Sequence, residues 1–216
     1  MDNILNLFKI LSQGLSTTIL IFILTLLFAI PLGIVVAIAQ NSKNKILNAI
    51  TKIYILIIRG TPMMLQIIFV YFAPYYLFKL SYDRFLAVII AFVINYAAYF
   101  AEIFRSGILS IPKGQKEAAF TLGFSKVQTF YRIILPQVVK RILPSMSNEV
   151  ISLVKTTSLA QIIGVTEVFA LAQKQASFQF SILPLCIAAL IYLALCTIIT
   201  FVFNKLEKKF GYYTIT

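Results

Sequence analysis

Long runs without a charged residue constrain this chain more than any other feature. No charge occurs across residues 10–42, 61–78 or 175–204. As helices, runs of this length are long enough to cross a hydrocarbon core of about 30 Å. The whole chain is 60% apolar and only 12% charged, whereas about a quarter of the residues of a soluble domain are charged. We therefore expect a multi-pass protein of the plasma membrane, with lipid as part of its solvent.

The apolar runs predict an all-α membrane protein with about five transmembrane helices in a single domain, residues 1–216. The first run has no small-residue cleavage site, so we expect a membrane span and not a cleavable signal. Breaks are expected at Arg59–Pro62 and near Gly164, where glycine and proline interrupt the pattern. An amphipathic helix is expected over residues 46–58. The five predicted spans are residues 15–39, 61–78, 85–108, 137–155 and 175–204.

The positions of lysine and arginine predict the orientation of these spans. Of the 19 basic residues, 14 (Arg59 among them) fall on one side, four on the other, and Lys155 is unassigned. Loops rich in lysine and arginine stay in the cytoplasm. We therefore expect the N-terminus outside and the C-terminus inside. Because the charges flank apolar runs, the net charge of +12 indicates topology and not a nucleic-acid partner.

The composition excludes several kinds of catalytic and metal site. The chain has no histidine, which removes Ser-His triads and the histidine-based zinc motifs. Both cysteines lie in the last apolar run and do not suggest a metal pair. No Gly-Lys pair occurs, so the chain has no P-loop for a nucleotide. We predict a chain without enzymatic activity, with no catalytic residues, no metal site and no cofactor of its own.

The most informative motif lies in a polar segment at about residues 113–136. It reads Glu117-Ala118-Ala119, then Gly123 after three residues, followed by Ile133, Leu135 and Pro136. This pattern resembles the EAA signature of the permease (transmembrane) subunits of ABC importers. The resemblance implies a coupling helix that docks on a cytoplasmic ATPase, with Glu117, Ala118, Ala119 and Gly123 as docking residues. From the residues alone, an ordinary cytoplasmic connector is the alternative.

Further motifs are similar to the polar amino acid branch of this family and cover nearly the whole chain. The resemblance implies a type I importer permease that moves a polar amino acid. It also implies an ATPase dimer that binds ATP and Mg²⁺, an extracytoplasmic amino acid-binding protein, and a second permease copy, most simply an identical one. Thr156 stands where many members have aspartate. The motifs are Arg59–Pro62, Ala101–Ile103, Ser110–Gln115, Leu135–Gln137, Asn148-Glu149, Lys155–Leu159 and Gly164–Glu167.

Asn95, Tyr99 and Glu102 lie at i, i+4 and i+7, on one face of the third predicted span. An acidic group is costly in lipid, so Glu102 is expected to face protein or water. One interpretation is a polar pocket for an amino or guanidinium group of the substrate. The other is a structural pair with Arg105. With no obvious cation on its own face, the carboxylate favours a basic amino acid such as arginine, lysine or histidine.

Two chain breaks add candidates to this site. A helix unwound after Lys155 would expose hydroxyls at membrane depth, whereas the alternative is a helix cap with a snorkelling lysine. Thr61 either lines the same path or only begins a span, and Asn148 and Glu149 either line the path or pair with each other or a neighbouring helix. The predicted substrate-binding residues are Asn95, Tyr99, Glu102, Thr157, Ser158 and Thr61.

A secondary carrier driven by an ion gradient, or a channel-like protein, is the alternative function. The sequence argues against it, because we find no internal inverted repeat. A long polar loop of partner-binding character is present instead. Reconstitution distinguishes the two functions, because a carrier transports alone, whereas a permease needs ATP and another subunit.

Overall fold

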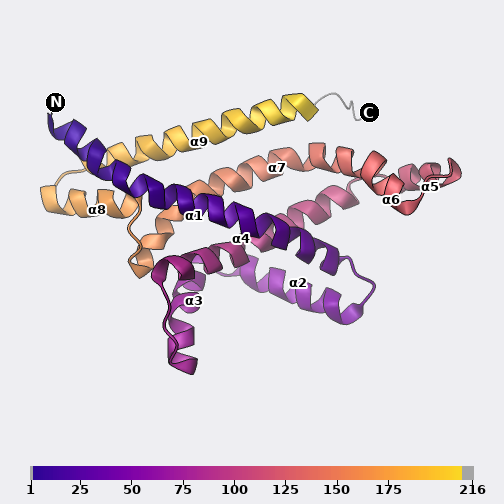
Figure 1. Cartoon of the computed structure of the whole chain (residues 1–216), viewed down its shortest axis with the longest axis horizontal. Coiled ribbons are helices and arrows are strands. Elements are labelled where there is room, and N and C mark those ends of the chain that lie inside the picture. The colour runs from indigo at the N-terminus through magenta and orange to yellow at the C-terminus, as the bar shows by residue number, and fades with distance from the viewer. Residues whose placement is uncertain (1, 211–216) are drawn as a thin grey trace.

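In the computed structural model, residues 2–210 are described, with side chains from residue 4 onward, and this part of the chain contains helices and no strands. The helices form an elongated bundle (Figure 1). Four of them run along its long axis: α1 (Asp2–Gln40), α4 (Arg84–Leu109), α7 (Leu135–Thr156) and α9 (Leu183–Phe210). The predicted all-α fold is confirmed.

The remaining elements are shorter. The helices α2 (Lys45–Gly60) and α3 (Met63–Phe78) meet at an angle of 111°, so that α3 projects sideways from the bundle (Figure 1). One end of the bundle carries α5 (Lys113–Thr121), α6 (Lys126–Gln128) and a π-helix (Thr129–Ile134). The other end carries α8 (Val168–Gln179), which follows a 3₁₀-helix (Thr157–Ile163).

Each predicted span corresponds to a helical element, but not all of these elements are equally apolar. By length and composition, α1, α4 and α9 can cross a membrane, and the bent pair α2–α3 counts as a fourth span if it is taken as one. The helix α7 is 22 residues long but carries four charged side chains. It is therefore not among the helices that are apolar enough to cross a membrane by composition. It packs between α4 and α9 within the bundle. A count of five spans therefore depends on α7, which is shielded by its neighbours.

Two predicted boundaries are wrong. The first helix begins at Asp2 and not near residue 15, because Leu7 and Leu11 are fully buried against α8 and α9. The predicted span 175–204 is divided, since α8 ends at Gln179 and α9 begins only at Leu183. Pro184 follows in the first turn of α9, where proline is tolerated, whereas a helix running into it from before is disfavoured.

Close approach between helices positions α1 on the bundle. A Cβ added to Gly33 would lie 2.9 Å from the Cβ of Phe100, so glycine lets α1 lie directly on α4. At the other end, a Cβ on Gly14 would clash with the backbone of Glu167, just before α8. These two contacts place α1 directly against α4 and against the start of α8.

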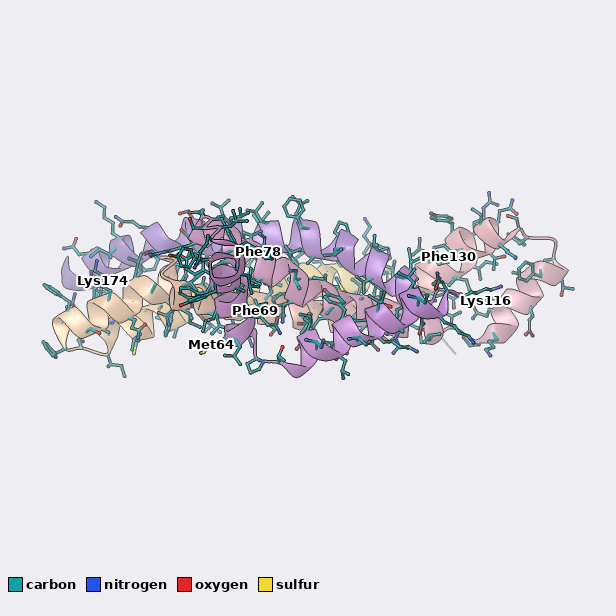
Figure 2. The ribbon with its side chains drawn as sticks, turned by 90° about the horizontal axis from the view of Figure 1, so that it is seen from below. Met64, Phe69, Phe78, Lys116, Phe130 and Lys174 are labelled. Atoms are coloured by element: carbon teal, nitrogen blue, oxygen red, sulfur yellow. The ribbon has the colours of Figure 1, made fainter. Side chains whose placement is uncertain are left out.

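The helix termini that adjoin the basic segments lie at one end of the bundle. The ends of α1, α4 and α9 and the start of α7 point toward the end of the bundle that carries α5 and α6 (Figure 1). Lys116 lies at this end and Lys174 at the opposite one (Figure 2). This arrangement agrees with the charge pattern of the sequence. Which end faces the cytoplasm stays a prediction.

Candidate functional site

A cavity of about 360 Å³ lies between α2, α4 and α7. Its size is in the range of small-molecule sites, roughly 300–1,000 Å³. The end of α2 at Gly60 places Arg59 at the cavity, because Thr61 and Pro62 turn the chain into extended backbone before α3 begins. The charged and polar lining residues are Arg59, Tyr99, Glu102, Ser106, Ser145, Asn148 and Glu149.

Arg59 and Glu149 give the cavity one positive and one negative group that are open to a ligand. The guanidinium carbon of Arg59 lies 5.1 Å from the centre of the Tyr99 ring, a cation–π contact. Glu149 accepts no hydrogen bond and forms no ion pair within residues 2–210. The guanidinium group of Arg59 can donate hydrogen bonds to a carboxylate, and the carboxylate of Glu149 can accept them from an ammonium group. The pair therefore suits a zwitterionic ligand. The sequence interpretation used Arg59 as a topology signal and as part of the Arg59–Pro62 break and motif, but did not name it as a substrate-binding residue.

Glu102 also lines the cavity, but it has a cation beside it. Its Oε1 accepts a hydrogen bond of 3.0 Å from the Nε of Arg105 in an ion pair one turn along α4. The Nε2 of Gln40 lies 3.5 Å from the other carboxylate oxygen. The argument that no cation shares its face is therefore wrong. Glu102 therefore forms the structural ion pair with Arg105 and also lines the cavity.

Asn95 and Thr61 lie outside this cavity and bridge the α2–α3 bend. The Nδ2 of Asn95 donates to the Oε1 of Gln66 at 2.8 Å, and the Nε2 of Gln66 donates to the Oγ1 of Thr61 at 2.8 Å. Thr61 and Gln66 instead line a separate, largely apolar cavity of about 400 Å³ inside the bend. Asn95 and Thr61 therefore stabilise the bend between α2 and α3 in this structure.

Thr157 and Ser158 also lie away from the cavity. The chain tightens into a 3₁₀-helix there and does not unwind, so the hydroxyls bond locally. The hydroxyl of Thr157, which is fully buried, donates to Val154 O at 2.7 Å, and that of Ser158 donates to Lys155 O at 2.8 Å. Of the six predicted site residues, only Tyr99 and Glu102 meet at the cavity between α2, α4 and α7.

The predicted docking loop contains a turn that requires glycine. Gly123 has φ +79°, the left-handed region, and the backbone N–H of Phe124 donates to Ala119 O at 3.0 Å across the turn. A Cβ built on Gly123 would meet no atom of the described residues within 4 Å. Close approach by another surface is therefore not needed to explain this glycine, because the backbone conformation already requires it.

The side chains of this loop divide between an inner and an outer face. Ala119 is 2% exposed and packs against the protein itself, so its side chain is little accessible here, and its role in docking stays a prediction. Glu117 and Ala118 are exposed. Figure 2 shows Lys116 and Phe130 at this tip of the molecule. The exposed apolar side chains there are Phe120, Leu122, Val127, Phe130 and Tyr131. Such a patch, rimmed by polar residues, is typical of a protein-binding surface.

Comparison with known proteins identifies the kind of protein that this architecture belongs to. Residues 29–212 match the family described as "Binding-protein-dependent transport system inner membrane component". The chain belongs to this family. It is therefore a multi-pass inner-membrane subunit of a transport system, and the resemblance to ABC importer permeases is confirmed.

Relatives in the family are amino acid permeases of similar length. The L-cystine transport system permease protein TcyB of Bacillus subtilis is 39% identical over 94% of this chain and 88% of its own length. The arginine transport system permease protein ArtQ of the same organism is 37% identical over 91% of this chain and 90% of its own length. A crystal structure of an amino acid ABC transporter with histidines has a TM-score of 0.86 at 29% identity, covering 93% of this chain and 94% of that one.

Proposed function

We propose that this chain forms the translocation path of an ATP-driven importer for a polar amino acid. The observation that carries the proposal is the cavity that Arg59, Tyr99, Glu102 and Glu149 line together. The names of the relatives support the class of substrate, since they are permeases for cystine and arginine. The chain itself contributes no catalysis.

The charges of the cavity match both ends of an amino acid. The Arg59 guanidinium holds the substrate carboxylate, and its contact with Tyr99 keeps it in place. The free carboxylate of Glu149 accepts hydrogen bonds from the α-ammonium group or from a basic side chain. A basic amino acid is favoured over an acidic one, because the carboxylate of Glu149 would repel a second carboxylate, whereas Glu102 is already paired with Arg105.

The partners follow from the loop and from the family. The exposed patch around α5 and α6 docks on a cytoplasmic ATPase dimer, which binds ATP and Mg²⁺. Glu117 and Ala118 contribute from the exposed face, and Gly123 sets the turn. An extracytoplasmic amino acid-binding protein delivers the substrate to the opposite end of the bundle.

A second copy of the chain completes the transmembrane unit. The helix α3 projects from the bundle with apolar side chains on all sides, among them Phe69 and Phe78 (Figure 2). Phe69 is 68% and Phe78 is 70% exposed. A two-fold related copy would cover part of this surface and close the cavity from the side.

Uptake by proteoliposomes that contain the purified permease, its ATPase and its binding protein tests this function. Labelled L-arginine, L-glutamine and L-cystine are supplied separately, with and without ATP on the side of the ATPase. We expect uptake of at least one of them that depends on ATP and on all three components. Uptake by the permease alone under an ion gradient would identify a secondary carrier instead.

A further inference from the structure

A second, smaller cavity continues from the first toward the end of the bundle that carries α5 and α6. It has a volume of about 250 Å³ and lies between α4 and α7. Ile103, Ser106 and Ser145 line both cavities, so the two form successive parts of one groove. The groove leads from the proposed substrate cavity toward the proposed ATPase-binding end.

Arg141 places a positive charge in the second cavity. One guanidinium nitrogen donates to the backbone carbonyl of Ser110, at the end of α4. The Nε of the same side chain is buried and has no hydrogen-bond partner among residues 2–210. No ion pair of Arg141 is found in that part of the chain. A buried donor without a partner is unfavourable, so the site is incomplete without an acceptor.

The serines supply the opposite kind of group. The hydroxyl of Ser106 donates to Ile103 O at 2.9 Å, and that of Ser110 donates to Gly107 O at 2.7 Å. With their hydrogens committed to the helix backbone, both oxygens still have lone pairs to offer as acceptors. The second cavity therefore presents a donor for a carboxylate and acceptors for an ammonium group.

Tight packing closes the groove beside this cavity. A Cβ on Gly107 would clash with the side chain of Ile142, and Val138 lies close to the same point. Because α4 and α7 touch there, a molecule in the second cavity lies next to a constriction between the two helices. Separation of these helices would open a path onward.

We propose that the cavity at Arg141 is a second amino acid subsite, which holds the substrate between the first cavity and its release. The Arg141 guanidinium binds the carboxylate, and Ser106 and Ser110 accept from the ammonium group. This subsite rests on the proposed function, because its ligand is the imported amino acid.

A structural role for Arg141 is the competing explanation, since it also ties α7 to the end of α4. Two variants separate the roles. Arg141→Gln removes the charge, whereas Ser110→Val fills the cavity and leaves the backbone carbonyl that Arg141 contacts. Ser12→Val is the matched control, because the hydroxyl of Ser12 donates to Lys9 O at 2.8 Å in the same local pattern, on exposed helix surface. Lys52→Gln controls for loss of one exposed positive charge.

The test is equilibrium binding to the nucleotide-free complex of permease and ATPase, with whichever of labelled L-arginine, L-glutamine or L-cystine the wild-type liposomes import. We expect two binding steps for wild type and for both controls. Arg141→Gln and Ser110→Val should each weaken one step at least about tenfold, as expected for one lost charge-assisted contact, and leave the other step unchanged.

Three outcomes would overturn the subsite. They are a single binding step in wild type, two unchanged steps in Arg141→Gln, or loss of a step in Arg141→Gln but not in Ser110→Val. The last result would assign Arg141 to the structural tie alone. Failure of the proposed function is a different observation, namely no ATP-dependent uptake of any of the three amino acids by the wild-type complex.

Discussion

The guanidinium carbon of Arg59 lies 5.1 Å from the centre of the Tyr99 ring, which joins the last turn of α2 to the middle of α4. This contact gives a positive charge a fixed position at the wall of the 360 Å³ cavity. Arg59 lies in the last turn of α2, directly before the bend that follows Gly60.

Arg59→Gln should weaken substrate binding. The variant loses a charge-assisted contact to the substrate carboxylate, and we expect about a ten- to hundredfold higher apparent KM for uptake. Arg59→Lys should fall between wild type and Arg59→Gln, because lysine keeps the charge but lacks the planar fork. Uptake kinetics in proteoliposomes give both values.

The control for this change is Lys52→Gln, which removes one exposed charge elsewhere on α2. It should leave the KM within the experimental error. An unchanged KM in Arg59→Gln, with the ATPase still bound, would show that Arg59 does not contact the substrate.

The variants Glu102→Gln and Arg105→Gln distinguish a substrate contact of Glu102 from a purely structural pair with Arg105. Each variant breaks the same ion pair, but only Glu102 lines the cavity. If Glu102 contacts the substrate, Glu102→Gln should raise the apparent KM about tenfold or more, whereas Arg105→Gln should change it little. Substrate-stimulated ATP hydrolysis by the reconstituted complex is the measurement. Equal effects of both variants would assign Glu102 to the structural pair alone.

Gly123→Ala should weaken the attachment of the ATPase. Any side chain at φ +79° is strained by about 1–2 kcal/mol, so the turn that presents α5 and α6 will shift. Gly114→Ala is the matched control, because that glycine lies in α5 without a positive φ and its added Cβ would also meet nothing. The readout is the amount of ATPase that co-purifies with the permease. If equal amounts of ATPase co-purify with both variants, the conformation of the turn at Gly123 does not contribute to ATPase binding.

Glu167→Gln should destabilise the bundle without any direct effect on the cavity. The fully buried carboxylate of Glu167 caps α8 by accepting from the backbone N–H groups of Phe169 and Ala170, both at 2.7 Å, and from the hydroxyl of Tyr192 at 2.6 Å. A glutamine donates where these groups need an acceptor, and we expect a loss of about 1–3 kcal/mol.

Thermal unfolding in detergent measures this loss. Asp83→Asn is the matched control, since Asp83 caps α4 through one hydrogen bond to Leu86 at an exposed position. We expect a much smaller shift of the unfolding temperature for Asp83→Asn. Comparable shifts for the two variants would show that burial and the Tyr192 contact add nothing to the cap.

The sequence predicted the helical elements because lipid-facing runs and Gly-Pro breaks are local signals. The breaks at Arg59–Pro62 and near Gly164 are found where the pattern placed them. The start of the first helix was missed, because the burial of Leu7 and Leu11 depends on α8 and α9, far along the chain.

The candidate site was predicted only in part, for the same reason. Tyr99 and Glu102 share a helix face, so their common position could be derived from spacing. Arg59 and Glu149 come from other helices, and only the packing of α2 and α7 on α4 brings them to the cavity. The inward orientation of Ala119 likewise depends on contact with the π-helix that follows it.

Amino acid uptake with and without ATP tests the central claim most directly. Proteoliposomes that contain wild-type permease, ATPase and binding protein are compared with liposomes that contain the permease alone, each with and without an imposed proton or sodium gradient. The account predicts uptake only in the complete system, only with ATP, and independent of either gradient. Gradient-driven uptake by the permease alone, without ATP, would contradict it.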